Sequence, residues 1–195
     1  MIDEMLRFNK KFVEEKQYEK FQTSKYPDKK LAILTCMDTR LVELLPAALG
    51  IKNGDVKLIK NAGGMITDPF DSAVRSLLVG IVELGVEEVM VIGHTDCGVS
   101  GINADMMIHH LLQRGVSKDH IDMMRYCGVN FEKWLHGFDC VENSVQETVD
   151  FLIHHPLMPN DVVIKGYIIN TETGELTPLA ALDASNVQMQ AVGIE

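Results

Sequence analysis

Four short apolar runs, separated by segments with helical periodicity, constrain this chain more than any other feature of its sequence. The runs occupy residues 31–35, 56–59, 89–92 and 162–169. Continuous apolar runs of this length are typical of strands that are buried on both faces. Strands that alternate with helices form a mainly parallel sheet with helices on its faces. We therefore predict an α/β fold with about four parallel strands and a short extra strand near residues 175–177.

The segments between these runs carry helix signals. Helices are predicted over residues 3–22, from Leu41 to near Gly50, from Asp68 to Leu84 and over residues 142–154. A further helix is predicted to begin within residues 93–98. Asp68 followed by Pro69 is a good helix start, because the acid caps the helix and proline suits its first position. Residues 114–141 are predicted to form short helices, with Trp134 as the residue that anchors their packing. The N-terminal helix packs either on its own domain or on a second subunit.

Length and composition predict one ordinary globular domain. The chain has 195 residues, which is enough for one sizeable core. Hydrophobic residues make up 46% and charged residues 24%, as in soluble globular proteins. No internal repeat, low-complexity segment or linker divides the sequence. We therefore expect residues 1–195 to form a single domain.

The net charge limits the classes of partner that the chain can bind, and the sequence also indicates its cellular compartment. The formal net charge is −10, which disfavours nucleic acid and anionic membranes as partners. No apolar stretch is long enough to span a membrane, and the N-terminus lacks the continuous apolar middle of a signal peptide. A cytoplasmic location is therefore expected, where thiols stay reduced. The four cysteines then favour metal ligands, catalytic groups or buried side chains over disulfides.

Three candidate metal ligands follow the ends of two predicted strands. Cys36 ends the first strand, and His94 and Cys97 follow the third. In an open parallel sheet, ligands bind outside the carboxyl ends of the strands, where the strand order reverses. If the first and third strands are neighbours, the three side chains converge. Two thiolates and one imidazole suit zinc, and three protein ligands leave a fourth position open, as in catalytic sites.

Each of these residues taken alone has a simpler interpretation. A single cysteine at a strand end is more often a buried apolar residue than a ligand. The combination of three residues at strand ends, two of them within one His-x-x-Cys turn, favours the metal site. Cys97 is also predicted to lie near a helix start, where the helix dipole would favour its thiolate.

Asp38 and Arg40 follow Cys36 by two and four residues, so they lie on the loop beside the predicted metal. A carboxylate there could accept a hydrogen bond from water on the metal and orient it. An arginine could hold that carboxylate bidentately and keep it ionised. The alternative is a surface ion pair of little energetic consequence. Their position beside Cys36 favours the functional interpretation.

Taken together, these motifs resemble those of β-class carbonic anhydrases, and more the short archaeal and bacterial branch than the plant type. The resemblance is strong over residues 30–100 and extends to about residue 178. It is carried by four segments: Cys36-Met37-Asp38-Thr39-Arg40, Asn61-Ala62-Gly63-Gly64, Arg75-Ser76-Leu77 and Ile92-Gly93-His94-Thr95-Asp96-Cys97-Gly98.

The resemblance implies a zinc enzyme that converts CO2 and water reversibly to bicarbonate and a proton, by attack of zinc-bound hydroxide. It implies one Zn2+ per chain, held by the three predicted ligands Cys36, His94 and Cys97. It also implies that Asp38 and Arg40 form the orienting pair.

The resemblance further implies a homodimer or an assembly of dimers, with the N-terminal helix reaching across to the partner. We also expect Gly63 and Gly98 to line the substrate pocket. Two thiolates offset the charge of Zn2+, which weakens its Lewis acidity relative to a site with three neutral histidines. Activity is therefore expected to rise towards alkaline pH.

Other functions remain open from the sequence. A hydrolase for COS or CS2 would use the same zinc scaffold with a different pocket. A non-catalytic, zinc-stabilised regulatory protein would need the ligands but not Asp38 and Arg40. A thiol enzyme with Cys36 or Cys97 as nucleophile would leave His94 and Arg40 without a shared role.

Overall fold

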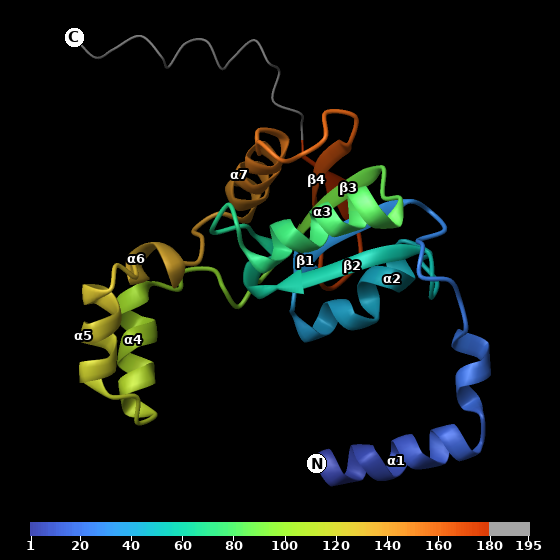
Figure 1. The fold of residues 1–195 in the computed structure, drawn as a ribbon, viewed down its shortest axis with the longest axis horizontal. Coiled ribbons are helices and arrows are strands. Elements are labelled where there is room, and N and C mark those ends of the chain that lie inside the picture. The colour runs from blue at the N-terminus through green and yellow to red at the C-terminus, as the bar shows by residue number, and fades with distance from the viewer. Residues whose placement is uncertain (180–195) are drawn as a thin grey trace.

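A computed structural model describes residues 1–179, which contain one five-stranded sheet flanked by helices (Figure 1). The strand order is β2-β1-β3-β4-β5. Strands β1 to β4 are parallel, and β5 is antiparallel to β4. The strands are β1 Leu31–Cys36, β2 Val56–Asn61, β3 Glu88–His94, β4 Val163–Ile169 and β5 Leu176–Pro178. The predicted α/β class, with four parallel strands and a short final strand, is confirmed.

The strand order reverses beside β1. From β1 the chain passes to β2 on one side, and from β2 it returns to β3 on the other side of β1. Strands β1 and β3 are therefore neighbours, with Thr35 opposite Ile92. This arrangement meets the condition on which the predicted metal site depended. The carboxyl ends of β1 and β3 form the switch point at which such sheets bind ligands.

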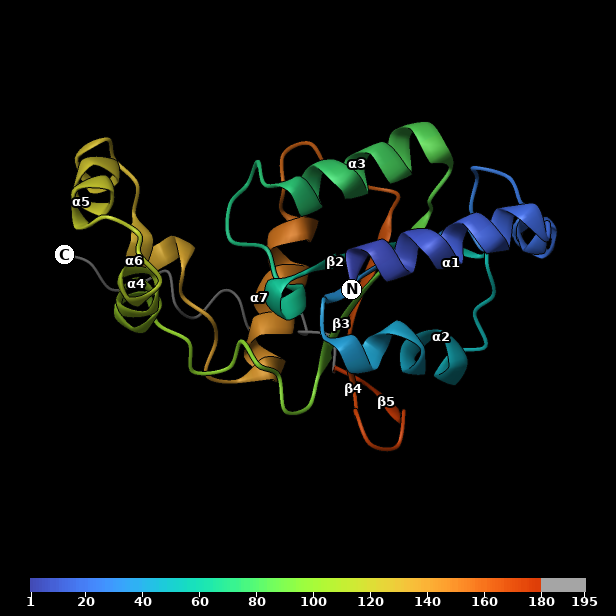
Figure 2. The same cartoon turned by 90° about the horizontal axis from the view of Figure 1, so that it is seen from below.

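Helices cover both faces of the sheet. Helices α3 (Ser72–Leu84) and α7 (Val141–Ile153) share a buried apolar cluster with one face, and α2 (Leu44–Ala48) packs on the other. Figure 2 shows α2 and α3 on opposite sides of the sheet. Successive side chains of β1 alternate between the two layers: Leu34 packs with α3 and α7, and Ile33 packs with α2. Both side chains are fully buried, so the middle of β1 is held by packing from two sides.

Helix α3 begins later than predicted. Its first residue is Ser72, and the cap is Asp71, whose carboxylate accepts a hydrogen bond from the N–H of Val74. The carboxylate of Asp68 instead accepts from the N–H of Phe70, which closes a local turn before the helix. The predicted start at Asp68 is therefore wrong, because a short acidic side chain serves a turn as readily as a helix cap.

The segment predicted as one helix from Leu41 to near Gly50 is divided in two. A 3-10 turn spans Thr39–Val42, and α2 follows it. Pro46 is the third residue of α2. The first-turn N–H groups of a helix have no partner within the helix, so proline is tolerated there.

Helices α4 (Ala104–Gln113), α5 (Lys118–Tyr126) and α6 (Phe131–Trp134) form a small lobe that stands apart from the sheet (Figure 1). The lobe has its own core, made of Ala104, Ile108, Ile121 and Phe131. Trp134 is 60% exposed, so its predicted role as the packing anchor is wrong. Phe131 occupies the buried position of this short helix, and the Trp134 ring lies 6.2 Å from it on the outer side. No helix in the described part of the chain is long and apolar enough to cross a membrane.

Helix α1 (Ile2–Glu14) leaves its apolar face uncovered. The predicted helix over residues 3–22 breaks at Lys16, whose φ of 54° lies in the left-handed region, and a 3-10 turn follows over Gln17–Phe21. None of the residues of α1 is buried. Five of its large apolar side chains are exposed, namely Ile2, Met5, Leu6, Phe8 and Val13, and Phe12 is half-buried. Figure 1 shows the helix well away from the sheet.

Candidate metal centre

The three predicted ligands converge at the carboxyl ends of the two central strands. Cys36 is the last residue of β1, His94 is the last residue of β3, and Cys97 lies in the turn that follows β3. Their ligand atoms all lie within 4.8 Å of one another. The two sulfur atoms are 3.8 Å apart. All three residues are buried, and only 1% of the surface of His94 is exposed.

The donor set fits a tetrahedral zinc ion. Two sulfurs bound to one tetrahedral Zn2+ at about 2.3 Å are roughly 3.8 Å apart, as these are. The Nδ1 of His94 lies 2.9 Å from the carbonyl oxygen of Thr95, which fixes the tautomer with the proton on Nδ1. Its Nε2 is buried and has no hydrogen-bond partner among residues 1–179. A buried imidazole nitrogen with a free lone pair is an available metal ligand.

The two thiols differ in acidity. Burial alone would raise the pKa of Cys36, but the nearby His94 imidazole and the backbone N–H groups of Asp38 and Gly63 outweigh it and lower the pKa to about 7. Burial raises the pKa of Cys97 to about 11, and the charge of Cys36 adds to this effect. Cys36 is therefore the thiolate that is ready for a metal, and Cys97 must exchange its proton for the ion.

The predicted helix start at Cys97 is wrong. Helix α4 begins only at Ala104, capped by Asn103. Residues 97–100 form a turn, in which the N–H of Ser100 donates to the carbonyl of Cys97. The Cys97 sulfur receives the N–H of Val99 but no helix dipole, and its pKa is raised rather than lowered. The Gly-rich stretch after the cysteine favours a turn over immediate helix formation.

A glycine loop after β2 closes over Cys36. Gly63 and Gly64 have φ values of 83° and 65°, in the left-handed region that favours glycine. A β-carbon on Gly64 would lie 2.8 Å from the backbone nitrogen of Cys36. Only glycine therefore lets this loop approach β1 closely enough for the Gly63 N–H to reach the sulfur. Gly98 is exposed, and a β-carbon there would meet nothing within 4 Å.

Asp38 and Arg40 form the predicted bidentate pair beside the ligands. Arg40 donates from Nε to Asp38 Oδ1 at 3.0 Å and from Nη2 to Asp38 Oδ2 at 2.8 Å. Asp38 Oδ2 lies 3.9 Å from His94 Nε2, so the carboxylate faces the ligand cluster. The hydrogen bonds from Arg40 hold the pKa of Asp38 well below its usual range. Asp38 therefore stays ionised and acts as a hydrogen-bond acceptor at physiological pH.

Sequence reasoning missed two further partners of Arg40. The guanidinium also contacts Asp96, in the turn between His94 and Cys97, and Thr171, just after β4. Asp96 lies within the His-Thr-Asp-Cys motif, but the motif does not indicate that this residue contacts Arg40. Thr171 is distant in the sequence and carried no signal.

Two cavities adjoin the ligand cluster. One, of about 530 Å³, has a polar rim and is lined by His94, Cys97, Asp96, Asp139 and Glu142, among others. The other, of about 310 Å³, is mainly apolar and is lined by Met65, Val99, Ile102, Trp134 and Leu135, among others. Met65 and Val99 also pack against the buried cluster that contains both ligand cysteines. The centre therefore has polar surroundings on one side and apolar surroundings on another.

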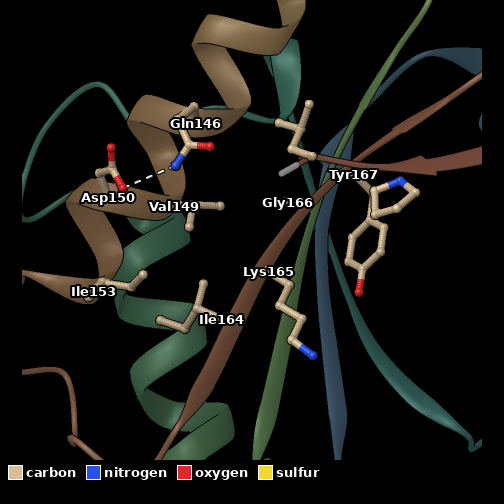
Figure 3. Close-up of a pocket in the computed structure, with 10 residues that line it drawn as sticks. Gln146, Val149, Asp150, Ile153, Ile164, Lys165, Gly166 and Tyr167 are labelled. Carbon is tan, nitrogen blue, oxygen red and sulfur yellow. Dashed lines mark hydrogen bonds between the residues drawn. The ribbon is translucent and has the colours of Figure 1, made fainter. Parts of the chain in front are cut away.

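A third cavity, of about 310 Å³, lies between α7 and β4 (Figure 3). Gln146 donates a hydrogen bond to Asp150 at 3.1 Å on its helical wall, and Val149 and Ile164 supply apolar surface. None of its lining residues is a ligand of the cluster or contacts Arg40. It therefore has no evident part in the chemistry of the metal centre.

Zinc affinity is expected to fall in two stages as the pH is lowered. Between about pH 11 and pH 7 zinc has to displace the proton of Cys97, so the affinity falls about tenfold per pH unit. Below about pH 7 the proton of Cys36 must also be displaced, so the fall steepens to about a hundredfold or more per unit. Competition with a chromophoric chelator of known protonation measures both slopes. A single slope from pH 5.5 to 9 would contradict the assigned thiol acidities.

Comparison with known proteins agrees with this geometry. A family model described as carbonic anhydrase matches residues 31–176. YtiB of Bacillus subtilis (strain 168), provisionally named a carbonic anhydrase, is 51% identical over 176 residues, which cover 90% of this chain and 94% of YtiB. A carbon disulfide hydrolase of Acidithiobacillus thiooxidans is 33% identical over 77% of each chain. The crystal structure of β-carbonic anhydrase isoform I from Trichomonas vaginalis superposes with a TM-score of 0.82 at 32% identity, covering 91% of this chain and 96% of that one.

Proposed function

This chain belongs to the β-class carbonic anhydrase family, and we propose that it is a zinc enzyme that hydrates CO2 reversibly to bicarbonate and a proton. The observation that carries the proposal is the buried cluster of Cys36, His94 and Cys97, with the ionised Asp38 facing it. Three protein ligands are the pattern of a catalytic zinc site, whereas structural zinc sites use four.

The residues of the centre have distinct proposed roles. When bound, Zn2+ would supply the Lewis acidity that ionises a water molecule near neutral pH. Asp38 would accept a hydrogen bond from water at the centre and so orient the lone pair of that water towards the substrate. Arg40 keeps Asp38 ionised and oriented through its two parallel hydrogen bonds. Thr95 fixes the tautomer of His94 through its carbonyl.

We place CO2 on the apolar side of the centre. The cavity that contains Met65 and Val99 offers the surroundings that a small apolar molecule prefers. Gly63 packs against this side, because a β-carbon there would lie 3.1 Å from the Met65 sulfur. The proposed pocket roles of Gly63 and Gly98 follow from their positions beside Cys36 and Cys97.

A second candidate function is hydrolysis of CS2 or COS on the same scaffold. The specific support is the relative named carbon disulfide hydrolase, which is 33% identical to this chain. Those substrates are also small, linear and apolar, so the same zinc chemistry would serve them. A purely structural zinc site is disfavoured, because stability alone does not require the ionised Asp38 and its arginine.

Stopped-flow hydration of CO2 on metal-quantified protein tests the proposal, with COS and CS2 hydrolysis measured in parallel. We expect rapid CO2 turnover with about one zinc per chain, and a rate that rises towards alkaline pH. Zinc-loaded protein that hydrolyses CS2 or COS but leaves CO2 unchanged would support the second candidate. Zinc-loaded protein that converts none of the three would refute both.

We further propose that the chain forms a homodimer, or an assembly of dimers, through α1. The support is the amphipathic helix itself, because Phe12 packs only near Phe21 of the following turn and the other large apolar side chains of the helix are exposed. An exposed apolar surface of this kind marks an interaction site in soluble proteins. A second copy of the chain would bury it.

Replacing an apolar residue of α1 by a charged one is expected to shift the protein towards the monomer. Leu6→Glu places a charge on the exposed apolar face, and burying it in an interface would be costly. Arg7→Glu changes charge on the same helix outside the apolar face and serves as the control. Sedimentation velocity at micromolar concentration measures both. A dimer that withstands Leu6→Glu but not Arg7→Glu would contradict an apolar α1 interface.

We place the enzyme in the cytoplasm. All four cysteines of the chain are free of disulfides, and both ligand cysteines must remain reduced to bind zinc. The reducing cytoplasm maintains that state.

A further inference from the structure

The guanidinium of Arg40 joins three loops at the metal centre. Beyond its two hydrogen bonds to Asp38, it donates from Nη1 to Asp96 Oδ2 at 2.9 Å and from Nη2 to the Asp96 carbonyl at 2.7 Å. A longer contact of 3.5 Å joins Nη1 to Thr171 Oγ1. An arginine has five N–H donors, and this set engages all of them.

Asp96 is held in a conformation that suits this role. Its φ of 52° lies in the left-handed region, which is uncommon for a residue other than glycine and best tolerated by Asn and Asp. Its side chain is 86% exposed, so a simple ion pair with Arg40 would be weak in water. The second bond, from Arg40 to the backbone carbonyl, gives the contact a fixed direction.

Thr171 brings the β4–β5 hairpin into the same network. Its N–H donates to Thr95 Oγ1 at 3.1 Å, and the two threonine hydroxyls are also 3.1 Å apart. The loop after β3 and the hairpin after β4 are therefore bonded to each other beside Arg40. The guanidinium is therefore held by both of these loops as well as by Asp38.

We propose that Asp96 and Thr171 are positioning residues that lock the Arg40 guanidinium, and through it the direction in which Asp38 faces the metal centre. The consequence for catalysis rests on the proposed function. Asp38 can orient water only while Arg40 holds both of its oxygens. Loss of the outer contacts leaves Arg40 bound to Asp38 alone, on an exposed loop.

This proposed arrangement, in which Asp96 and Thr171 lock the Arg40 guanidinium and which we call the lock, predicts a particular kinetic signature. Neither residue is a metal ligand or lines the apolar cavity, so zinc content and KM should stay near the wild-type values. The rate of the chemical step should fall, because a mobile Asp38 orients water only part of the time. Asp96→Ala should lower kcat about tenfold with KM within about twofold. Asp96→Asn keeps an acceptor oxygen and tolerates the left-handed φ, so it should restore most of kcat.

Nuclear magnetic resonance of the Arg40 side chain tests the lock without reference to turnover. In 15N-labelled protein, zinc-loaded and zinc-free, we expect slow rotation of the guanidinium about its Nε–Cζ bond. Asp96→Ala and Thr171→Val should each speed this rotation about tenfold or more, because each removes an acceptor. Asp139→Ala removes a carboxylate from the rim of the polar cavity and should leave the rotation unchanged.

The possible results separate the lock from the proposed function. An unchanged rotation rate in both Asp96→Ala and Thr171→Val, with the proteins folded by circular dichroism, would overturn the inference. A fall of kcat that Asp96→Asn does not reverse would also count against it. A slow-rotating Arg40 in a wild-type enzyme without CO2 hydration would uphold the lock and overturn only the proposed function.

Discussion

Cys97→Ser is expected to abolish zinc binding and CO2 hydration together. The substitution replaces one of two sulfur ligands by a hydroxyl, which does not ionise near neutral pH and binds Zn2+ poorly. Zinc content should fall from about one per chain to below about 0.1, and CO2 hydration by at least about a thousandfold. Atomic absorption on dialysed protein and stopped-flow hydration measure the two quantities.

Cys127→Ser is the matched control for this substitution. Cys127 is an exposed cysteine at the end of α5, in the lobe that stands apart from the sheet. The same change of sulfur to oxygen there should alter neither zinc content nor rate. A Cys97→Ser protein that keeps a full complement of zinc would remove Cys97 from the ligand set. Circular dichroism of both variants separates loss of metal from loss of fold.

Asp38→Asn is expected to lower activity strongly while leaving the metal in place. The amide has the same shape as the carboxylate but no charge, and it can no longer accept both hydrogen bonds from Arg40. Water at the centre then loses its oriented anionic acceptor. We expect kcat/KM to fall about a hundredfold at an unchanged zinc content.

The control for Asp38→Asn is Asp28→Asn, in the exposed turn that precedes β1. It makes the same chemical change away from the ligands and should keep the wild-type rate. A fall in zinc content in Asp38→Asn would show that the carboxylate supports the metal rather than the reaction. A wild-type rate in Asp38→Asn would refute its role in orienting water.

The sheet and the ligand cluster were predictable because both depend on local patterns and one topological rule. The apolar runs identified the strands, and Cys36, His94 and Cys97 stood at strand ends. The sequence could not show that β1 and β3 are neighbours, since a strand order is a property of the whole chain. The structure supplies that adjacency, and with it the convergence of the three predicted ligands.

The errors arose where one residue type suits two local structures. Asp68 closes a turn instead of capping α3, because a short carboxylate bonds nearby N–H groups in either setting. The residues after Cys97 favour a turn, so the expected helix dipole is absent there. Trp134 lies outside the small core because Phe131 already fills the buried position of α6.

The contacts of Arg40 with Asp96 and Thr171 were beyond sequence reasoning for a different reason. They depend on the exact direction of a backbone carbonyl and on a hairpin that is far away along the chain. Periodicity and motif spacing carry no information on such contacts. They emerge only when three loops meet at one edge of the sheet.

The neighbouring positions of β1 and β3 also bear on how the protein matures. On a growing polypeptide Cys36 leaves the ribosome well before His94 and Cys97, and it has no partner ligand until β3 has paired with β1. Under the proposed function, a zinc ion bound at that moment would close the long loop that contains β2 and α3 and would tie the two central strands together. Zinc binding would then depend on correct pairing of β1 with β3, because the three proposed ligands converge only in the paired strands.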